Sequence, residues 1–270
     1  MNEERKCDMK GYKGFTPGLV CKDKQYQENT VFEEPEANIC EKGMHFCENP
    51  FDVLDYYGLV RPDGSFNNFA EVEALDETRT DDFKKFCTKK LKIGVRLSFS
   101  GFVKACVDFV LEKTIREMPD ANVGSGDNAK IGSSGDYAQI GSSGYYAQIG
   151  SSGDNAQIGS SGDNAKIGSS GDNAKIGSSG DNAKIGSSGD YARINCTGSD
   201  SVIFCAGYGS VVKAQIGCWI TLSEWEYDGA KQRHVPACVK TEYVDGERIK
   251  ADTPYTLKNG EFVEAESDGD

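Results

Sequence analysis

Residues 129–194 decide the fold, and they read AKIGSSGDY AQIGSSGYY AQIGSSGDN AQIGSSGDN AKIGSSGDN AKIGSSGDN AKIGSSGDY ARI. A nine-residue unit, Ala-x-Ile-Gly-Ser-Ser-Gly-Asp-Asn, recurs there without a gap. In an extended strand the alanine and the isoleucine point to the same side, and Gly-Ser-Ser-Gly is typical of a turn. Because so short a strand cannot bury its apolar face alone, successive units must stack. The repeat therefore predicts a parallel β-solenoid, and its glycines and serines exclude a helix.

Two units are expected to form each coil, so that two parallel sheets lie back to back. This prediction places Ile131 beside Ile149 and Ile140 beside Ile158, in a core made of isoleucine and alanine columns. With strands about 4.8 Å apart, the perfect repeats make a rod roughly 20 Å long. Imperfect copies of the unit at both ends extend the predicted solenoid to residues 119–221.

The side chains on either side of the alanine form outward columns that a partner would meet. The residues before it are Asn128, Tyr137, Tyr146, Asn155, Asn164, Asn173, Asn182 and Tyr191, and those after it are Lys130, Gln139, Gln148, Gln157, Lys166, Lys175, Lys184 and Arg193. In a two-sheet coil Tyr137 and Tyr191 share one face with Lys175 and Arg193. Since tyrosine and arginine dominate many interfaces, we predict that these four residues bind a protein partner, with self-association as an alternative.

Simpler interpretations of these columns stay open. Polar ladders on a solvated sheet need no ligand, the tyrosines can pack only on one another, and the terminal regions can do all the binding. Alanine at Tyr137, Tyr191 and Arg193 separates these interpretations, because a fold that stays intact with unchanged binding would remove the rod from the interface.

Composition narrows the class of protein. The net charge of −13 argues against a nucleic-acid ligand, and the repeat region 121–195 holds seven acidic against five basic residues, too even a balance for a DNA mimic. Ten cysteines without an export signal or a CxxC pair indicate reduced thiols, so we expect a cytoplasmic protein. The sequence has no apolar run long enough to cross a membrane, so no membrane partner is expected.

The regions on either side of the repeat predict two further modules. Residues 1–118 indicate a small α+β head, in which Glu48-Asn49-Pro50 starts a short helix and residues 99–117 form a longer one. That longer helix is expected to cap the first coil, because a bare solenoid end exposes strand edges. Residues 222–270 indicate an antiparallel β-hairpin cap with an acidic tail and with turns at Asp228-Gly229, Asp245-Gly246 and Asn259-Gly260. The expected fold class is mainly β.

Metal and nucleophile signals are weak. Cys21, Cys40, His45 and Cys47 could ligate zinc, but the last two share one side of an apolar strand, where thiols commonly belong to the core. The repeat is similar to the calcium-binding RTX nonapeptide, yet a corner explains its aspartate and Tyr145 replaces that aspartate in one unit. We therefore predict neither a metal nor a cofactor.

Three segments of the head carry a resemblance. Tyr-Lys-Gly-Phe (residues 12–15), Gly-Met-His-Phe-Cys-Glu-Asn-Pro (residues 43–50) and Ala-Glu-Val-Glu-Ala (residues 70–74) resemble an uncharacterised domain family of phage and gut-bacterial genomes. In that family the domain is often followed by Ile-Gly-Ser-Ser-Gly repeats, so the resemblance covers nearly the whole chain. It implies a phage or mobile-element protein that acts in the host cytosol, and it brings no activity with it.

The head is also similar, more loosely, to the ADP-ribosyltransferase fold. The matching positions are Tyr12-Lys13-Gly14, then Tyr56 or Tyr57, then Glu71 or Glu73. The resemblance implies that the glutamate would hold a ribose hydroxyl and stabilise an oxocarbenium-like transition state, while aromatic residues clamp nicotinamide. The first motif lacks the Arg or His that the family has there, so we predict no turnover of NAD.

The leading expectation is a non-enzymatic, intracellular protein-interaction or inhibitory factor that acts on a host or defence protein. An ADP-ribosyltransferase-like enzyme that the solenoid directs to a target is the alternative. Extracellular adhesion comes third, because the repeats are similar to trimeric autotransporter heads but the sequence has no export signal.

Overall fold

The computed structural model describes residues 3–5, 9–39, 41–61, 65–114, 122–124 and 126–265. Contacts within the chain divide it into two compact units, residues 1–102 and residues 103–270, which we call the head and the solenoid unit. The expected boundary between residues 118 and 119 lies outside the described residues. The one expected between residues 221 and 222 falls inside a continuous strand, Trp219–Asp228.

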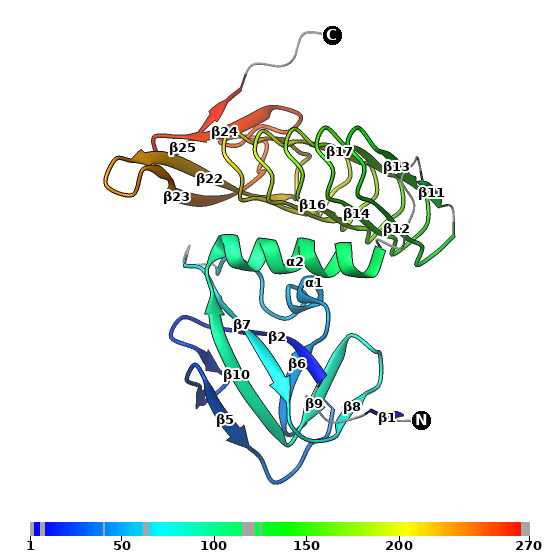
Figure 1. The fold of residues 1–270 in the computed structure, drawn as a ribbon, viewed down its shortest axis with the longest axis vertical. Coiled ribbons are helices and arrows are strands. Elements are labelled where there is room, and N and C mark those ends of the chain that lie inside the picture. Colours follow the sequence, from blue (N-terminus) through cyan, green and yellow to red (C-terminus); the bar gives the residue numbers. More distant parts are fainter. Residues whose placement is uncertain are drawn as a thin grey trace. The chain divides into compact units, whose positions relative to one another are not determined.

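The head is built on an antiparallel sheet. Its strands are β1 (Glu3–Arg5), β2 (Met9–Phe15), β5 (Thr30–Glu33), β6 (Met44–Cys47), β7 (Asn68–Ala74), β8 (Thr78–Thr80), β9 (Lys85–Thr88) and β10 (Lys90–Leu97). They run in the order β1-β8-β9-β6-β2-β7-β10-β5, so β2 and β7 lie in the middle (Figure 1). A separate ribbon is formed by β3 (Val20–Cys21) and β4 (Lys24–Gln25).

Local sequence explains the head's short helix and its apolar core. Helix α1 (Pro50–Val53) begins where it was predicted, because the Asn49 side chain accepts a hydrogen bond from the Phe51 N–H at 3.0 Å and Pro50 needs no partner for its nitrogen. In β7 the residues alternate, with Ala70 and Val72 on one face. That face joins a buried cluster that includes Phe15, Met44, Phe46, Phe86, Leu91 and Ile93.

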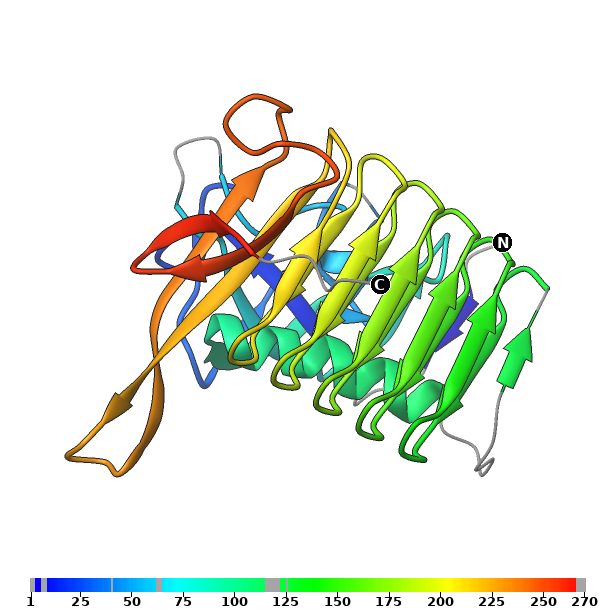
Figure 2. The same cartoon turned by 90° about the horizontal axis from the view of Figure 1, so that it is seen from above.

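The solenoid unit has the two back-to-back parallel sheets that the repeat predicts (Figures 1 and 2). One sheet runs β12 (Lys130–Ser133), β14 (Gln148–Ser151), β16 (Lys166–Ser169), β18 (Lys184–Ser187), β20 (Val202–Cys205), β22 (Trp219–Asp228) and β23 (Arg233–Tyr243). The other runs β11 (Asn122–Gly124), β13 (Gln139–Ser142), β15 (Gln157–Ser160), β17 (Lys175–Ser178), β19 (Arg193–Cys196), β21 (Val211–Lys213), β24 (Pro254–Lys258) and β25 (Glu261–Glu264). We call them the covered sheet and the open sheet.

Register confirms that 18 residues make one coil. Ile131 pairs with Ile149, and Ile140 pairs with Ile158, so each isoleucine stacks on the one two units later. The imperfect units continue the stack, since Ile203 pairs with Ile185 and Ile220 pairs with Ile203. The solenoid therefore reaches at least to β22.

The core contains a column that was not predicted. Besides isoleucine and alanine, the first serine of each unit points inward, and its hydroxyl is buried without a hydrogen-bond partner at Ser151, Ser160, Ser169, Ser178 and Ser187. Strand alternation explains this, because the serine lies two residues after the isoleucine and so shares its face. Later coils place Cys196 and Cys205 in the same columns.

Corner residues lock one coil onto the next. The aspartate carboxylate accepts a hydrogen bond from the backbone N–H found 18 residues later, as Asp163 does from Asp181 at 3.0 Å. The second glycine of each unit lies so close to the previous coil that a Cβ on Gly162 would be 2.0 Å from the Gly144 carbonyl oxygen. Both features bind consecutive corners, so the aspartate and this glycine have structural roles.

Helix α2 (Phe99–Thr114) lies along the face of the covered sheet (Figure 1). A Cβ placed on Gly168 would be 3.3 Å from the Val107 Cα and 3.5 Å from the Val110 Cβ. The expectation that this helix closes the first coil is therefore wrong, since Gly168 belongs to β16 in the middle of the sheet. The first glycine of each unit, such as Gly168, explains the difference. These glycines form a column along the sheet, and without side chains they let a helix approach the sheet backbone closely.

The cap continues both sheets of the solenoid. β22 pairs in parallel with β20 and antiparallel with β23, and β24 pairs with β21. The turn at Asn259-Gly260 is the predicted two-residue turn, with φ of +53° and +72°. The turn at Asp228-Gly229 is longer than two residues, because β22 ends at Asp228 and β23 begins only at Arg233.

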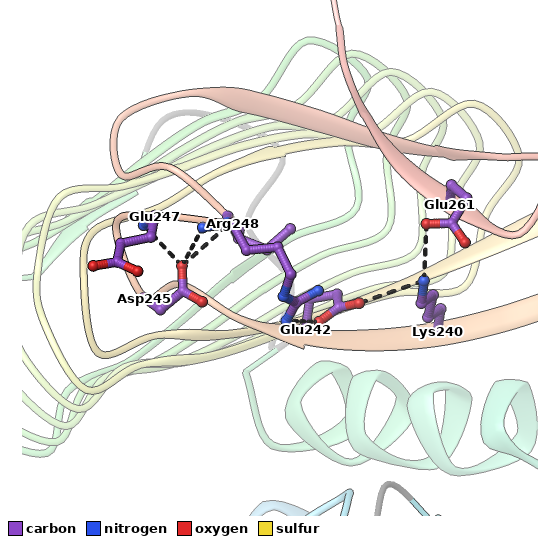
Figure 3. A network of polar contacts seen from close by, with 7 residues as sticks. Lys240, Glu242, Asp245, Glu247, Arg248 and Glu261 are labelled. Carbon is purple, nitrogen blue, oxygen red and sulfur yellow. Dashed lines mark hydrogen bonds and ion pairs between the residues drawn. The ribbon is translucent and has the colours of Figure 1, made fainter.

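The predicted hairpin at Asp245-Gly246 is absent from the described structure, in which a loop follows β23 instead. The Asp245 carboxylate accepts hydrogen bonds from the N–H groups of Glu247, Arg248 and Ile249 at 2.9 to 3.0 Å (Figure 3). These bonds stabilise a wide loop instead of a two-residue hairpin turn. Arg248 also forms an ion pair with Glu242. Lys240 lies 3.4 Å from Glu242 and 3.3 Å from Glu261, which links β23 to β25.

Candidate functional site

The open sheet carries a groove of about 860 Å³ on its outer face, the face toward the viewer in Figure 2. Its floor is the first glycine of alternate units, namely Gly141, Gly159 and Gly177. The edge is a column of polar side chains, Gln139, Gln157, Lys175 and Arg193. The floor ends where Asn195 and Lys213 take the place of glycine, with Asp252 and Pro254 beside them. The groove follows from the repeat, since every coil adds one more glycine.

The same glycine column meets opposite surroundings on the two sheets. On the covered sheet Gly150 and Gly168 are buried, and α2 lies against Gly168. On the open sheet a Cβ on Gly141 or Gly159 would have nothing within 4 Å. Identical units thus produce two glycine columns, one covered by α2 and one exposed on the open sheet.

Charge gathers at one end of the groove. Lys175 and Arg193 are direct neighbours in register, and both are exposed. Lys213 continues the lining and forms an ion pair with Asp252 at 2.9 Å. Like charges on adjacent strands repel each other, so this end of the groove favours a negatively charged ligand group. Of the predicted binding residues, the structure brings Lys175 and Arg193 together at the groove.

The predicted tyrosines lie at the corner before the open sheet. Tyr137 and Tyr191 have φ of +58° and +55°, a left-handed conformation that Asn adopts at the equivalent corners. Their side chains are 72 % and 52 % exposed, and they stand three coils apart, roughly 14 Å. Tyrosine has a steric cost in this conformation that asparagine largely avoids, and such strain is concentrated at functional sites.

Tyr191 belongs to an exposed aromatic cluster that sequence reasoning missed. Its ring meets Tyr208 edge-on at 5.5 Å, and His234 lies 5.7 Å from Tyr208 and 5.5 Å from Tyr227. Tyr208 stands 18 residues beyond Asp190, whose carboxylate accepts from its N–H at 2.7 Å. The period of 18 could have placed Tyr208 on the next coil. His234 and Tyr227 come from the hairpin β22–β23, whose position no spacing predicts.

The head contains a cavity of about 750 Å³. Its lining includes Lys13 of β2, Cys21 of β3, His45 of β6 and Tyr57, which follows α1. Lys13 is only 5 % exposed, and its Nζ donates to the His45 carbonyl at 2.8 Å. Burial lowers the pKa of Lys13, and it lowers the pKa of His45 to about 4. At neutral pH the imidazole is therefore uncharged.

The residues matched to the ADP-ribosyltransferase fold meet only in part in this cavity, because Tyr12, Lys13 and Gly14 line it whereas Glu71 and Glu73 do not. Tyr56 and Tyr57 line it, and the Tyr57 hydroxyl donates to Cys21 Sγ at 3.1 Å. Glu71 is exposed and pairs across the sheet with Tyr12, and Glu73 forms an ion pair with Lys92 at 3.3 Å. In β7 these glutamates alternate with Ala70 and Val72, so they point to the sheet face opposite the core.

The described residues meet neither the requirements of a metal site nor those of a membrane-spanning helix. Within the described ranges, no group of three or more His, Cys, Asp or Glu side chains is arranged to hold a metal ion. Cys40, the remaining residue of the zinc set, lies outside those ranges. No helix in the described part of the chain is long and apolar enough to span a bilayer.

Comparison with known families gives one match. Residues 9–105, less than half of the chain, match the family described as "Domain of unknown function (DUF7666)". The head is thus similar to an uncharacterised domain family, in agreement with the first resemblance. No curated protein and no solved structure matches the chain.

Proposed function

We propose that the protein is a non-enzymatic protein-interaction factor whose open sheet binds an amphipathic α-helix of a partner protein. The observation that carries the proposal is the glycine column, which α2 covers on one sheet and which is vacant on the other. If the protein is an inhibitor of a host or defence protein, it would act by covering such a helix.

The chain itself supports a helix as the occupant. On the covered sheet, Val107 and Val110 of α2 lie against Gly168, and Val103 is also buried, so the three valines follow one another at spacings of four and three. This spacing forms one stripe along a helix. The open sheet offers the same floor without side chains, at the same strand spacing, so a helix with a similar stripe can approach it equally closely.

Charge supports an acidic flank on that helix. Lys175 and Arg193 are adjacent on the groove edge, whereas the chain as a whole carries a net charge of −13. Carboxylates beside the apolar stripe would reduce the repulsion between these two cations, and complementary charge would guide the orientation of docking. The exposed Tyr137 and Tyr191 stand two residues before Gln139 and Arg193, so they would extend the contact beyond the groove edge.

Designed peptides test the proposal directly. One fluorescent peptide carries the apolar stripe of α2 with glutamate at its exposed positions, and a second carries lysine there. Fluorescence anisotropy with the full chain is expected to show binding of the glutamate peptide about tenfold tighter than binding of the lysine peptide, a difference of about 1.4 kcal/mol. Lys175→Glu combined with Arg193→Glu is expected to reverse this preference.

A matched pair of variants locates the site. Gly159→Val fills the groove at a position with open space, so the fold is retained and peptide affinity is expected to fall at least about tenfold. Ser161→Val changes an exposed residue of the same coil outside the groove lining and is expected to leave affinity unchanged. Equal affinity for both variants, or no binding of either peptide, would refute the proposal.

A further inference from the structure

The cavity of the head differs in its lining from the groove of the open sheet. We propose that this cavity binds a small carbonyl compound bearing an anionic group, and that the Lys13 amine forms an imine with its carbonyl carbon. The proposal concerns residues of the head alone and does not depend on the groove of the solenoid unit.

The position of Lys13 is unusual for a lysine. It lies on β2 with the same side-chain direction as Phe15, so its chain enters the core face of the sheet. Its Nζ lies 5.5 Å from the centre of the Phe15 ring and 5.6 Å from that of Tyr26. Lysine is rarely this buried unless it is paired with a carboxylate. Within the described residues, no ion pair between Lys13 and a carboxylate is found.

Burial favours a neutral amine at Lys13, although the neighbouring cysteines act in the opposite direction. Nζ donates to the His45 carbonyl at 2.8 Å, and Cys21 beside it raises the pKa of Lys13. Cys47 also raises the pKa of Lys13, and Lys22 lowers it. Burial is the largest influence and lowers the pKa of Lys13, which raises the neutral fraction. A neutral amine that donates a hydrogen to the His45 carbonyl keeps its lone pair for a carbonyl carbon.

The same cavity holds cationic groups for an anion, beside the carboxylates of Asp23 and Glu41 and those of Glu34 and Glu36, which form ion pairs with Lys24 and Lys42. Lys22 and Lys85 line it, and their charges add to burial in lowering the pKa of His45. Three amines therefore lie near one neutral imidazole. The Tyr57 phenol keeps its proton at neutral pH because burial raises its pKa, so it is a hydrogen-bond donor for an oxygen atom. A carboxylate or phosphate next to the carbonyl fits these donors.

The reaction needs no further reagent. The nitrogen lone pair attacks the carbonyl carbon, and the carbonyl π electrons move to oxygen, which takes up a proton to give a carbinolamine. The C–O bond then breaks while the C=N bond forms. Both amine hydrogens leave with the oxygen as one water molecule, so atoms and electrons balance without an oxidant or a reductant.

Reductive trapping tests the proposal. The full chain is incubated with pyruvate and sodium cyanoborohydride near neutral pH, and labelled peptides are identified by mass spectrometry. Cyanoborohydride reduces the imine at Lys13 to a secondary amine, which adds the mass of pyruvic acid less one oxygen atom. We expect Lys13 to be labelled at least about tenfold faster than the exposed Lys22, because desolvation activates a lysine nucleophile. Labelling of Lys13 no faster than Lys22 would overturn the proposal.

Variants and a second probe separate covalent chemistry from simple anion binding. Lys13→Met keeps an unbranched apolar side chain without the amine and is expected to abolish rapid labelling, whereas Lys22→Met retains the Lys13 adduct. Methyl pyruvate, which keeps the ketone but has an ester in place of the carboxylate, is expected to label Lys13 about tenfold more slowly than pyruvate. Equal rates would remove the anionic group from the proposal. If Lys13→Met does not fold, the peptide map of the unmodified chain still decides the outcome.

Discussion

Replacing the inward-facing serine of the repeat tests how the solenoid core is stabilised. Ser160 is 7 % exposed, and its Oγ is buried without a hydrogen-bond partner. Its register neighbours are Ser142 and Ser178, and the column continues at Cys196, where a thiol takes the place of the hydroxyl. The chain therefore already contains a coil in which this hydroxyl is absent.

The magnitude follows from the unpaired hydroxyl. Burying such a group without a partner costs about 1–3 kcal/mol. Ser160→Ala removes this cost and loses only the packing of one oxygen atom, so we expect the free energy of unfolding to rise by about 1 kcal/mol. The melting temperature of a unit of this size would rise by roughly 2–4 °C. Ser160→Cys should give a similar gain, as a thiol has weaker hydrogen-bonding needs and fills the space.

Urea unfolding followed by circular dichroism measures the effect, and fluorescence of Trp219 and Trp225 reports on the cap. Ser161→Ala is the matched control, because Ser161 is the exposed neighbour and its replacement should change stability by less than about 0.5 kcal/mol. A fall of about 1 kcal/mol or more for Ser160→Ala would show that the hydroxyl is hydrogen-bonded, and the reasoning would be refuted.

Other substitutions in the solenoid have opposite expected signs. Gly162→Ala would place a Cβ 2.0 Å from a carbonyl oxygen of the previous coil and should cost about 3 kcal/mol or more, whereas Gly159→Ala meets open space and should stabilise the strand by about 0.5–1 kcal/mol in thermal unfolding. Tyr137→Asn should raise the melting temperature, because asparagine tolerates its φ of +58° better; an unchanged or lower value would argue against strain there. The Ser199 N–H and hydroxyl lower the pKa of Asp181 below 3.8, so its contribution to stability is present above that pH and is lost as the pH falls through the lowered value. Melting temperatures of Asp181→Asn and the unmodified chain should therefore converge on acidification, and a constant difference would contradict this origin.

Much of the solenoid could be predicted because it depends on strand alternation and on the repeat period, both of which are read directly from the sequence. A strand buries alternate residues, so the position of Ile149 relative to Ile131 follows from the period alone. The same alternation also implied the inward serine, which was overlooked because a buried hydroxyl usually has a partner. The predicted hairpin turn at Asn259-Gly260 is confirmed, because its backbone angles suit these two residues. The hairpin predicted at Asp245-Gly246 is wrong, because the Asp245 carboxylate accepts hydrogen bonds from three N–H groups that a tight hairpin would not present.

The sequence by itself determined the coil of the solenoid, its two sheets and the residues on each outward column, because a strict period repeats one local conformation. Only the tertiary structure decided which sheet α2 covers, and therefore which glycine column stays open, since identical units differ only in what packs against them. It also decided that Lys13 is buried beside Cys21 and Tyr57. These residues come from β2, β3 and the chain after α1, and their proximity depends on strand pairing across the head rather than on spacing along the chain.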